Sequence, residues 1–475
     1  MSDPFVVVGG DAAGLSAASK LKREDPDREV VVFEKGNWAS YAHCGMPYYV
    51  KGEVPVLTDL LSLPPDRIEE RGIDLRRGHE VVAVDPDERV VSVERDGETV
   101  EQPYGDLLVA TGARAATEPV AGADLDGVYT MHGLDSAAAL RAALLDPETA
   151  TVEDLGGGGF VDADAVESHL RADPPETVAV VGGGYVGVEM AEAFAAHDLD
   201  VHVFQRGDHL LGPFGEPVAE RVEAHLREQG VTLHLGEAVV RLDSDGDDRV
   251  AEVVCPDSSL PVDLALVGVG VRPNTDLLDG SGVELGDSGA VAIDEFGRTN
   301  RENVYAAGDC AEMPHVVTGE PAWVPLGLTA NRAGRAVGQT VAGDPTTLGG
   351  VAGTAVLKAF DLECGRSGVT DHDEARTYGF EPVSETVTAG SRSGYYPGNA
   401  ETTVTLTADR ETGRLLGGTI VGADRAAIRI DTVATALEAG MTVAEVERLD
   451  LAYAPPFSPV WDPVLVAAKV LNGRL

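Results

Sequence analysis

Two glycine-rich turns, each between an apolar stretch and a run of small residues, constrain the fold of this chain more than any other feature. The first occupies residues 9–14 and has Asp11 where the G-x-G-x-x-G pattern has its middle glycine. The second occupies residues 182–187 and matches the pattern fully. The matching glycines are Gly9 and Gly14 in the first turn and Gly182, Gly184 and Gly187 in the second. Such turns place a pyrophosphate at a helix N-terminus, so two of them, about 170 residues apart, predict two dinucleotides.

The residue at the end of the strand after each turn bears on which dinucleotide is bound. Glu34 stands 20 residues after Gly14, and a carboxylate there suits the hydroxyl pair of a ribose. At the corresponding place in the second unit the chain has Gln205 and Arg206, where an NAD-preferring site would often carry an acid. Two interpretations of Arg206 are open: a contact to the 2′-phosphate of NADPH, which we favour, or a solvated side chain.

The length of 475 residues predicts about three domains. From about residue 349 the pattern changes to short strands at 354–359 and 402–407 and a late helix at 430–439, with no nucleotide turn. A module without a site of its own usually serves association, and the sequence therefore predicts a symmetric homodimer.

The charge of the chain excludes two classes of partner. Asp and Glu total 80 against 36 Lys and Arg, which gives a formal net charge of -44 spread along the whole chain. Nucleic acid and anionic membranes are therefore poor partners. Adaptation to a salt-rich cytoplasm is favoured over an acidic interaction protein, since only six of the 36 basic residues are Lys and ~1 M salt shortens the Debye length to ~3 Å.

The cysteines are widely spaced, with no C-x-x-C pair and no metal-ligand spacing. They are Cys44, Cys255, Cys310 and Cys364. The N-terminus lacks a charged segment followed by an apolar one, and no apolar run of ~18 residues occurs. We therefore expect a cytoplasmic protein in a reducing compartment, with no metal site and no membrane span.

Cys44 is the cysteine placed where a redox reaction could use it, in the stretch 40–49 downstream of the first turn. Pro47 is suited to the first turn of a helix, so a helix is predicted just after Cys44. The N–H groups of that helix would lower the pKa of the thiol. The alternative is a buried, inert cysteine, which is the interpretation we favour for the other three.

The order of these motifs resembles that of the flavin-dependent pyridine nucleotide-disulfide oxidoreductases, and within them the single-cysteine group of coenzyme A-disulfide reductases, NADH oxidases and persulfide reductases. The resemblance covers nearly the whole chain except residues 145–175. Relatives of glutathione reductase use two cysteines five apart, whereas this chain has Ala39 and Tyr49 on either side of Cys44. The resemblance implies that Cys44 alternates between a thiolate and either a mixed disulfide or a sulfenic acid.

The resemblance also assigns roles to individual residues. FAD is expected on Gly9, Gly14, Glu34, Thr111, Gly112 and Asp309, although Asp309 is also explained as a turn residue. NAD(P)H is expected on Gly182, Gly184 and Gly187, with Glu189 beside the nicotinamide. The positions that contact CoA in the family correspond to Ser16, Lys20, Arg23, Ser40 and His43. Tyr395 and Tyr453 match two tyrosines that approach the cysteine from the other subunit, where each could protonate a leaving thiolate, although both lie in aromatic clusters that packing alone would explain.

The predicted fold class is α/β, with two Rossmann-like nucleotide-binding domains, for FAD and NAD(P)H, and a C-terminal α+β dimerisation domain. The FAD-binding domain is expected at 1–118 and 276–345, the NAD(P)H-binding domain at 119–275, and the dimerisation domain at 346–475. An acidic stretch near 145–175, which includes the glycines 156–159, is interpreted as a surface insertion.

The resulting expectation is a homodimeric, NAD(P)H-dependent flavoprotein that reduces a low-molecular-weight disulfide, preferably CoA disulfide, through Cys44. The chain differs from the family at His43, where Asn is common, and at Trp461, where Lys is common. We expect no rhodanese-like extension after Leu475, which disfavours a dedicated sulfur-transfer enzyme. Three alternatives stay open: an NADH oxidase that forms a sulfenate at the cysteine, a persulfide or polysulfide reductase, and a redox-sensing flavoprotein without rapid turnover.

Overall fold

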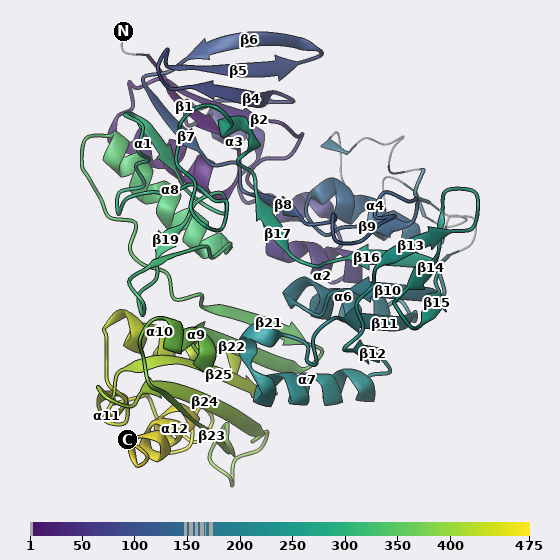
Figure 1. Cartoon of the computed structure of the whole chain (residues 1–475), viewed down its shortest axis with the longest axis vertical. Helices are drawn as coiled ribbons and strands as arrows, with labels where there is room; N and C mark the ends of the chain where they lie inside the picture. The colour runs from purple at the N-terminus through teal and green to yellow at the C-terminus, as the bar shows by residue number, and fades with distance from the viewer. Residues whose placement is uncertain are drawn as a thin grey trace.

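The structure is a computed structural model with three units, in which the central unit of the chain lies beside the N-terminal and C-terminal ones (Figure 1). It describes all residues except 1–2, 147–149, 152–154, 157–159, 162–165, 167 and 171–173. The N-terminal and central units each contain a parallel sheet, and the C-terminal unit contains an antiparallel one. The predicted α/β class with two Rossmann-like units and an α+β C-terminal unit is therefore confirmed.

The N-terminal unit is built on a five-stranded parallel sheet in the order β18-β7-β1-β2-β3. Its central strand is fully buried, because sequence-distant elements cover both faces, as is usual for parallel sheets. An antiparallel sheet, β4-β5-β6, lies beside it. The bounds are β1 (Phe5–Val8), α1 (Ala12–Glu24), β2 (Val30–Glu34), α2 (Met46–Lys51), α3 (Pro65–Glu69), β3 (Asp74–Arg77), β4 (Glu80–Asp85), β5 (Val90–Arg95), β6 (Glu98–Pro103), β7 (Asp106–Val109), β18 (Val304–Ala306) and α8 (Gly327–Val341).

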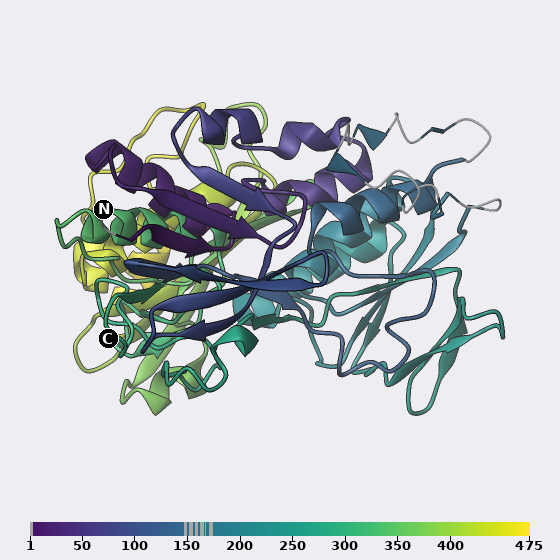
Figure 2. The same cartoon turned by 90° about the horizontal axis from the view of Figure 1, so that it is seen from above.

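Helix α8 belongs to the second segment of the N-terminal unit, which follows the central unit in sequence, and packs closely on α1 (Figures 1 and 2). Two glycines of α8 make this approach possible. A Cβ on Gly334 would collide with the backbone of Ala13, and a Cβ on Gly338 would collide with that of Ala17. The small residues of both helices therefore hold the two segments of this unit together.

The central unit contains the parallel sheet β12-β11-β10-β16-β9 and a small antiparallel sheet, β13-β14-β15. An antiparallel ribbon of β8 and β17 carries the chain from the N-terminal unit and back again (Figure 1). The bounds are β8 (Ala113–Ala115), β9 (Val128–Tyr129), α4 (Leu134–Leu144), β10 (Thr177–Val181), α6 (Tyr185–Ala195), β11 (Asp200–Gln205), α7 (Glu216–Glu228), β12 (Thr232–Leu235), β13 (Arg241–Ser244), β14 (Val250–Val254), β15 (Ser259–Pro261), β16 (Leu264–Val267) and β17 (Val271–Pro273).

The C-terminal unit is an antiparallel sheet in the order β21-β22-β25-β24-β23. Helices α10 and α12 pack on it, and α7 of the central unit contacts it as well. The bounds are β21 (Ala355–Ala359), β22 (Leu362–Gly368), α9 (His372–Thr377), β23 (Pro382–Gly390), β24 (Glu401–Asp409), β25 (Leu415–Gly422), α10 (Ile430–Glu438), α11 (Val443–Val446) and α12 (Pro463–Asn472). The short ribbon of β19 (Met313–Pro314) and β20 (Pro321–Ala322) precedes this unit and packs in the core of the N-terminal one. The predicted strands and the late helix agree with β21, β24 and α10.

The interpretation of 145–175 as a surface insertion is wrong for part of the described residues. Leu155 is fully buried, and Val161 and Val166 are also buried in the core that α2 and α4 share. The hydroxyl of Tyr49 in α2 donates to the carbonyl oxygen of Leu155 at 2.8 Å. Apolar residues scattered in an acidic stretch thus pack against the cysteine-bearing region. Of the predicted glycine run, 157–159 lie outside the described residues.

Candidate active site

Cys44 lies in a short 3-10 helix, η1 (His43–Gly45), that leads directly into α2. Pro47 sits in the first turn of α2, where its missing N–H removes no helical hydrogen bond. Cys44 is exposed, whereas the other three cysteines are buried, and all four are free. The buried ones are Cys255, Cys310 and Cys364. The predicted helix after Cys44 and the assignment of the other three cysteines to the core are confirmed.

The predicted lowering of the Cys44 thiol pKa is wrong for the protein alone. The residues packed around the sulfur remove enough solvent to raise the pKa of Cys44, and the carboxylates of Glu189 and Asp309 raise it further. A hydrogen bond from the backbone at Cys44 acts in the opposite direction but is outweighed. Loss of solvent around the sulfur, with the negative charges of two other segments added to it, therefore overcomes the helix N-terminus, because both effects disfavour the thiolate.

Glu189 of α6 faces the helix that follows Cys44. The hydroxyl of Tyr48 donates to Glu189 Oε1 at 3.4 Å. Burial raises the pKa of Glu189 to about 7, the hydrogen bond from Tyr48 lowers it, and the charge of Glu192 raises it. A carboxyl group with a pKa near 7 exchanges protons readily at neutral pH, which is a property of acid–base groups in active sites.

Glu192, one helical turn after Glu189, joins all three units. Its side chain is buried, and its Oε1 accepts hydrogen bonds from Lys51 Nζ of the N-terminal unit at 2.7 Å and from Lys358 Nζ of the C-terminal unit at 2.8 Å. Its Oε2 accepts the backbone N–H of Phe360 at 2.7 Å. This carboxylate therefore fixes α6, and with it Glu189, against α2 and β21.

The first glycine turn forms part of a cavity of about 320 Å³. Glu34, at the end of β2, accepts the N–H of Gly10 on Oε2 at 2.9 Å and that of Gly36 on Oε1 at 2.8 Å. The carboxylate is thus held at the edge of the cavity by the turn it faces. Predicted and unpredicted residues line the cavity together, among them Gly9, Glu34, Thr111 and Asn274.

The predicted residues of the first nucleotide site meet at one edge of the sheet. Gly9 follows β1, Thr111 follows β7 and Asp309 follows β18, and these strands are neighbours that run in parallel. Burial raises the pKa of Asp309 to about 6, and Asp11 raises it, while His43 lowers it. The carboxyl ends of parallel strands are where nucleotides bind in such sheets.

The second glycine turn repeats the geometry of the first. A Cβ on Gly187 would lie 1.8 Å from the carbonyl oxygen of Gly182, as a Cβ on Gly14 would lie 1.9 Å from that of Gly9. A Cβ on Gly184 would meet nothing within 4 Å, so it would project into open space at the start of α6. Such a cradle, which any side chain would begin to fill, fits the pyrophosphate of a dinucleotide.

The two nucleotide turns differ at the end of the following strand. Gln205 Oε1 accepts the N–H of Gly183 at 3.1 Å, which is the bond that Glu34 makes to Gly10 in the first unit. The negative charge of the first unit is therefore replaced by a neutral amide. The next residue, Arg206, is exposed and forms no ion pair with any residue that the structure describes.

A second cavity, of about 480 Å³, lies beside the segment that leads to Cys44. Three predicted substrate residues, Ser16, Arg23 and Ser40, line it. The other two predicted substrate residues, Lys20 and His43, do not line this cavity. Lys20 is buried and paired with Glu24, and His43 pairs with Asp11. Sequence reasoning missed several lining residues, namely Arg71, Asn331, Arg332 and Arg335.

The arginines of this cavity are its main electrostatic feature. Arg23, Arg71, Arg332 and Arg335 converge from α1, the segment after α3 and α8. None of the four forms an ion pair with the residues that the structure describes. Because acidic residues outnumber basic ones by 80 to 36 in this chain, four unpaired arginines at one cavity mark an anion-binding site.

Tyr395 and Tyr453 lie on loops of the C-terminal unit, Tyr395 between β23 and β24 and Tyr453 between α11 and α12. Their side chains are exposed, Tyr395 by 78% and Tyr453 by 49%. Further exposed apolar residues, Phe457, Val460 and Trp461, follow Tyr453 in the segment between α11 and α12. Exposed apolar patches of this kind mark protein interfaces.

Two family models match the chain. The model described as pyridine nucleotide-disulphide oxidoreductase matches residues 3–327, and that of the dimerisation domain of the same family matches residues 354–463. In the described residues, no helix is long and apolar enough to span a bilayer.

The similar proteins extend over almost the whole chain. An NAD(P)H coenzyme A polysulfide/persulfide reductase of Pyrococcus horikoshii is 39% identical over 474 residues, which is 99% of each chain. A coenzyme A disulfide reductase of Staphylococcus haemolyticus is 28% identical and covers 96% of each chain. The solved structure of an NAD-dependent persulfide reductase from A. fulgidus has a TM-score of 0.90 at 32% identity and covers 99% of this chain and 83% of that one.

Proposed function

Since the chain belongs to the pyridine nucleotide-disulphide oxidoreductases, we propose that it reduces the disulfide of a small thiol that carries phosphate groups. The proposed substrate is CoA disulfide, and the proposed preferred donor is NADPH. The chain is an FAD-dependent NAD(P)H oxidoreductase of the disulfide and persulfide class. Its matched dimerisation domain supports a homodimer.

The first glycine turn and the cavity beside Glu34 fit FAD. The carboxylate of Glu34 suits the ribose hydroxyls, and the turn that ends at Gly14 leaves the helix N-terminus free for the pyrophosphate. Thr111, Gly112 and Asp309 complete the proposed site. When bound, FAD supplies the chemistry that moves two electrons from NAD(P)H to sulfur.

The observation that carries the substrate proposal is the cavity with four unpaired arginines beside residues 40–41. Guanidinium groups bind phosphate with paired N–H donors, and none of these four is neutralised by a described carboxylate. A substrate that places its phosphates there can extend its sulfur toward Cys44, which lies three residues beyond Tyr41. A small uncharged disulfide would leave these four charges without a counter-charge, since the bonds of Arg71 to Ser19 Oγ and of Arg332 to the carbonyl oxygen of Gly350 are to neutral groups.

Cys44 is the proposed nucleophile. Its thiolate attacks one sulfur of the disulfide, the substrate S–S bond breaks, a mixed disulfide forms and one thiol leaves after it takes a proton. Two electrons from NAD(P)H then break the mixed disulfide, so that one disulfide, one NAD(P)H and one proton give two thiols and NAD(P)⁺. Because the protein raises the pKa of Cys44, a group must remove its proton, and Glu189, with a pKa of about 7, is suited to this.

The leaving thiolate needs a proton donor. We assign this role to Tyr395 and Tyr453 of the partner subunit, in agreement with their exposure on the matched dimerisation domain. The dimer would then be required for disulfide reduction but not for transfer of electrons within one subunit.

A persulfide or polysulfide of CoA is the second candidate substrate. Relatives at 38–40% identity over almost the whole chain are named as CoA-dependent sulfur, polysulfide or persulfide reductases. Such a substrate carries the same phosphates and would use the same arginines. The two candidates therefore share a binding site and differ in the sulfur that Cys44 attacks.

The donor preference follows from the end of β11. Gln205 puts no negative charge where a 2′-phosphate would lie, and Arg206 is free to pair with it. This combination supports NADPH over NADH.

An acceptor screen tests the proposal. FAD-loaded protein is given NADPH or NADH with CoA disulfide, CoA persulfide, a disulfide of similar reactivity without phosphate, or oxygen alone. We expect fast turnover with the CoA substrates and slow turnover with the other two. The Cys44→Ser variant should bind FAD and oxidise NADPH in a single turnover, yet lose disulfide reduction by about 10³-fold or more. Fast turnover with oxygen alone, or undiminished disulfide turnover in the variant, would contradict the proposal.

A further inference from the structure

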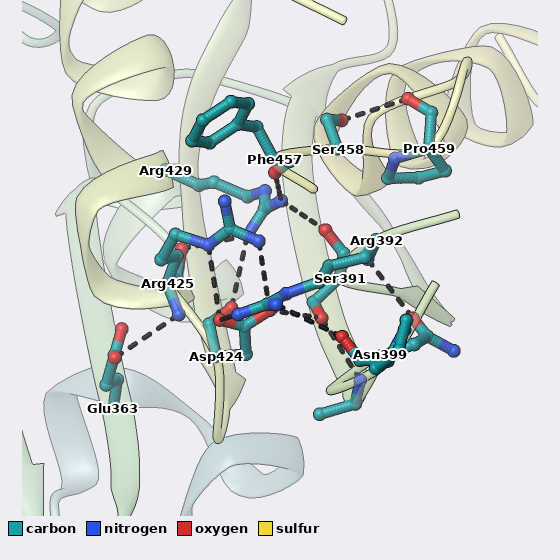
Figure 3. Close-up of polar contacts among 12 residues, drawn as sticks. Glu363, Ser391, Arg392, Asn399, Asp424, Arg425, Arg429, Phe457, Ser458 and Pro459 are labelled. Atoms are coloured by element: carbon teal, nitrogen blue, oxygen red, sulfur yellow. Dashed lines mark hydrogen bonds and ion pairs between the residues drawn. The ribbon is translucent and has the colours of Figure 1, made fainter. Parts of the chain in front are cut away.

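A cluster of charged residues in the C-terminal unit holds both tyrosine loops in place (Figure 3). We call it the loop clamp, and its members are Arg392, Asp424, Arg425, Arg429 and Asp462. It lies outside the nucleotide and arginine cavities, and none of its members was singled out in the sequence. The clamp matters because Tyr395 and Tyr453 lie on separate loops, one before β24 and one before α12.

Arg429 is the member that touches both loops. Its side chain is buried, with 8% of its surface exposed. Its Nη2 donates to the carbonyl oxygen of Ser391 at 2.7 Å, at the start of the Tyr395 loop, and to that of Phe457 at 3.2 Å, in the Tyr453 loop. One nitrogen of one guanidinium thus ties the two loops to each other.

The remaining donors of Arg429 fix the guanidinium itself. Nε pairs with Asp462 Oδ2 at 2.8 Å, and Nη1 donates to the carbonyl oxygens of Arg425 at 2.9 Å and Asp424 at 3.3 Å. Asp462 is also the N-cap of α12, since its Oδ1 accepts the N–H of Val464 at 3.0 Å. The orientation of Arg429 is therefore set by a helix end and by the turn after β25.

The Tyr395 loop has a second attachment to the clamp. Arg392 forms a two-bond pair with Asp424, at 2.7 Å from Nε and 2.8 Å from Nη2, and its Nη1 donates across the loop to the carbonyl oxygen of Pro397 at 3.2 Å. Ser391 Oγ also donates to Asp424 at 2.7 Å. These bonds, led by that of Arg392, lower the pKa of Asp424, which stays charged at any working pH.

The Tyr453 loop is closed by a turn and by the same acid that holds Arg429. The N–H groups of Phe457 and Ser458 both donate to the carbonyl oxygen of Ala454, at 2.8 and 3.0 Å, and Ser458 Oγ donates to Asp462 Oδ2 at 3.1 Å. The guanidinium of Arg425 lies 5.8 Å from the centre of the Phe457 ring. Both tyrosine loops are thus fixed in the free subunit, while the tyrosine rings stay exposed.

We infer that Arg429 is a positioning residue for disulfide reduction, which holds Tyr395 and Tyr453 as a preset pair for the active site of the partner subunit. The inference rests on the proposed role of these tyrosines. A loop that must be ordered during each docking event loses conformational freedom, whereas a clamped loop has lost it on folding. A displacement of about 1 Å in a proton donor can cost roughly 100-fold in rate, so a clamp that holds two donors acts directly on turnover.

The test compares Arg429→Met with Arg414→Met in the FAD-loaded dimer. Arg414 serves as the control because it also lies in the C-terminal unit and also holds a carbonyl oxygen, that of Val316 at 2.9 Å, but contacts neither tyrosine loop. Stopped-flow reduction by NADPH reports transfer within one subunit, and steady-state kcat with CoA disulfide reports the step at the tyrosines. We expect Arg429→Met to keep the rate of reduction by NADPH and the dimer mass, and to lower kcat by roughly 10- to 100-fold. The control should leave both rates near those of the wild type.

A second arm separates positioning from a general loss of structure. In a background with Tyr395→Phe and Tyr453→Phe, the Arg429→Met substitution should have no further effect on kcat, because the groups through which Arg429 acts are absent. Arg429→Lys, which keeps the pair with Asp462, should recover part of the rate. An equal loss in both backgrounds, or equal losses in Arg429→Met and Arg414→Met, overturns the inference. If the two tyrosine substitutions alone leave kcat unchanged, the proposed role of the tyrosines fails instead.

Discussion

The glycine turn of the central unit allows a matched test of packing against nucleotide binding. In Gly187→Ala the new Cβ would lie 1.8 Å from the carbonyl oxygen of Gly182, where ordinary contacts begin near 3.4 Å. The obstacle is backbone, so α6 must move away from β10 by about 1.6 Å, the difference between these two distances. Overpacking of this kind costs about 1–3 kcal/mol, and we take about 3 because no side chain can rotate away.

Part of that cost is offset by the helix itself. Alanine is better than glycine inside a helix by about 1 kcal/mol, and position 187 lies in the first turn of α6. The net destabilisation expected for Gly187→Ala is therefore about 2 kcal/mol. For a unit of this size that corresponds to a fall in melting temperature of about 4–8 °C.

The control is Gly184→Ala, three residues earlier in the same turn. Its φ of -82° is open to alanine, and its Cβ meets nothing within 4 Å. This methyl group should leave the stability of the fold unchanged. It should weaken the binding of a pyrophosphate, because the pyrophosphate approaches the backbone there. Melting of the FAD-loaded protein and the KM for NADPH are measured for both variants. Wild-type stability in Gly187→Ala, or lost stability with an unchanged KM in Gly184→Ala, would refute the reasoning.

Three further substitutions test the junction and the donor site. Glu192→Gln removes the carboxylate that Lys51 and Lys358 share, and among the described residues only Lys51 of the two keeps a second acid, Glu53. It should destabilise the protein by about 2 kcal/mol in denaturant titration, less than the 3–5 of a fully buried pair, because both lysines reach solvent and Lys51 stays paired. Because the pKa of Glu189 is raised to about 7 in the folded state from an ordinary 4.5, its carboxyl destabilises the fold progressively as pH rises from 4.5 to 7. Glu189→Gln should therefore match the wild type in stability near pH 4 and exceed it by up to about 3 kcal/mol at pH 8, and a pH-independent difference would contradict this. Arg206→Ala should raise the KM for NADPH and leave that for NADH unchanged, whereas equal effects on both would exclude a contact to the 2′-phosphate.

The parts of the site that sequence predicted are those in which local order decides the geometry. Each glycine turn lies within about 30 residues of the acid or amide that faces it, so strand, turn and helix can be assigned from one stretch of sequence. The bond of Glu34 to Gly10 and that of Gln205 to Gly183 are consequences of this local arrangement.

The pKa of Cys44 could not be predicted in the same way. The helix that follows it is local and was predicted, but the burial that raises the pKa arises from tertiary packing, and the acids that add to it, Glu189 and Asp309, belong to other segments far along the chain. Three of the four arginines of the cavity, Arg71, Arg332 and Arg335, were missed for the same reason, whereas Arg23 was predicted from the family resemblance. The missed arginines come from two segments distant from Arg23, and in the sequence each one has the pattern of an ordinary solvated side chain.

The net negative charge of the chain bears on which anions the arginine cavity can bind. A chain with a formal charge of -44 repels anions at long range, so an anionic substrate is favoured only where cations lie within contact distance. Salt shortens the range of the repulsion, from ~10 Å at 0.1 M to ~3 Å at 1 M, and weakens contacts inside a cavity much less. In a salt-rich solution the arginines of the cavity, such as Arg23 and Arg332, would therefore still attract phosphate at contact distance, while the long-range repulsion by the acidic surface would be largely screened. A polyanion such as nucleic acid is too large to enter the cavity and meets only the acidic surface, so the proposed preference for a small phosphate-bearing thiol agrees with the size of the cavity as well as with its charge.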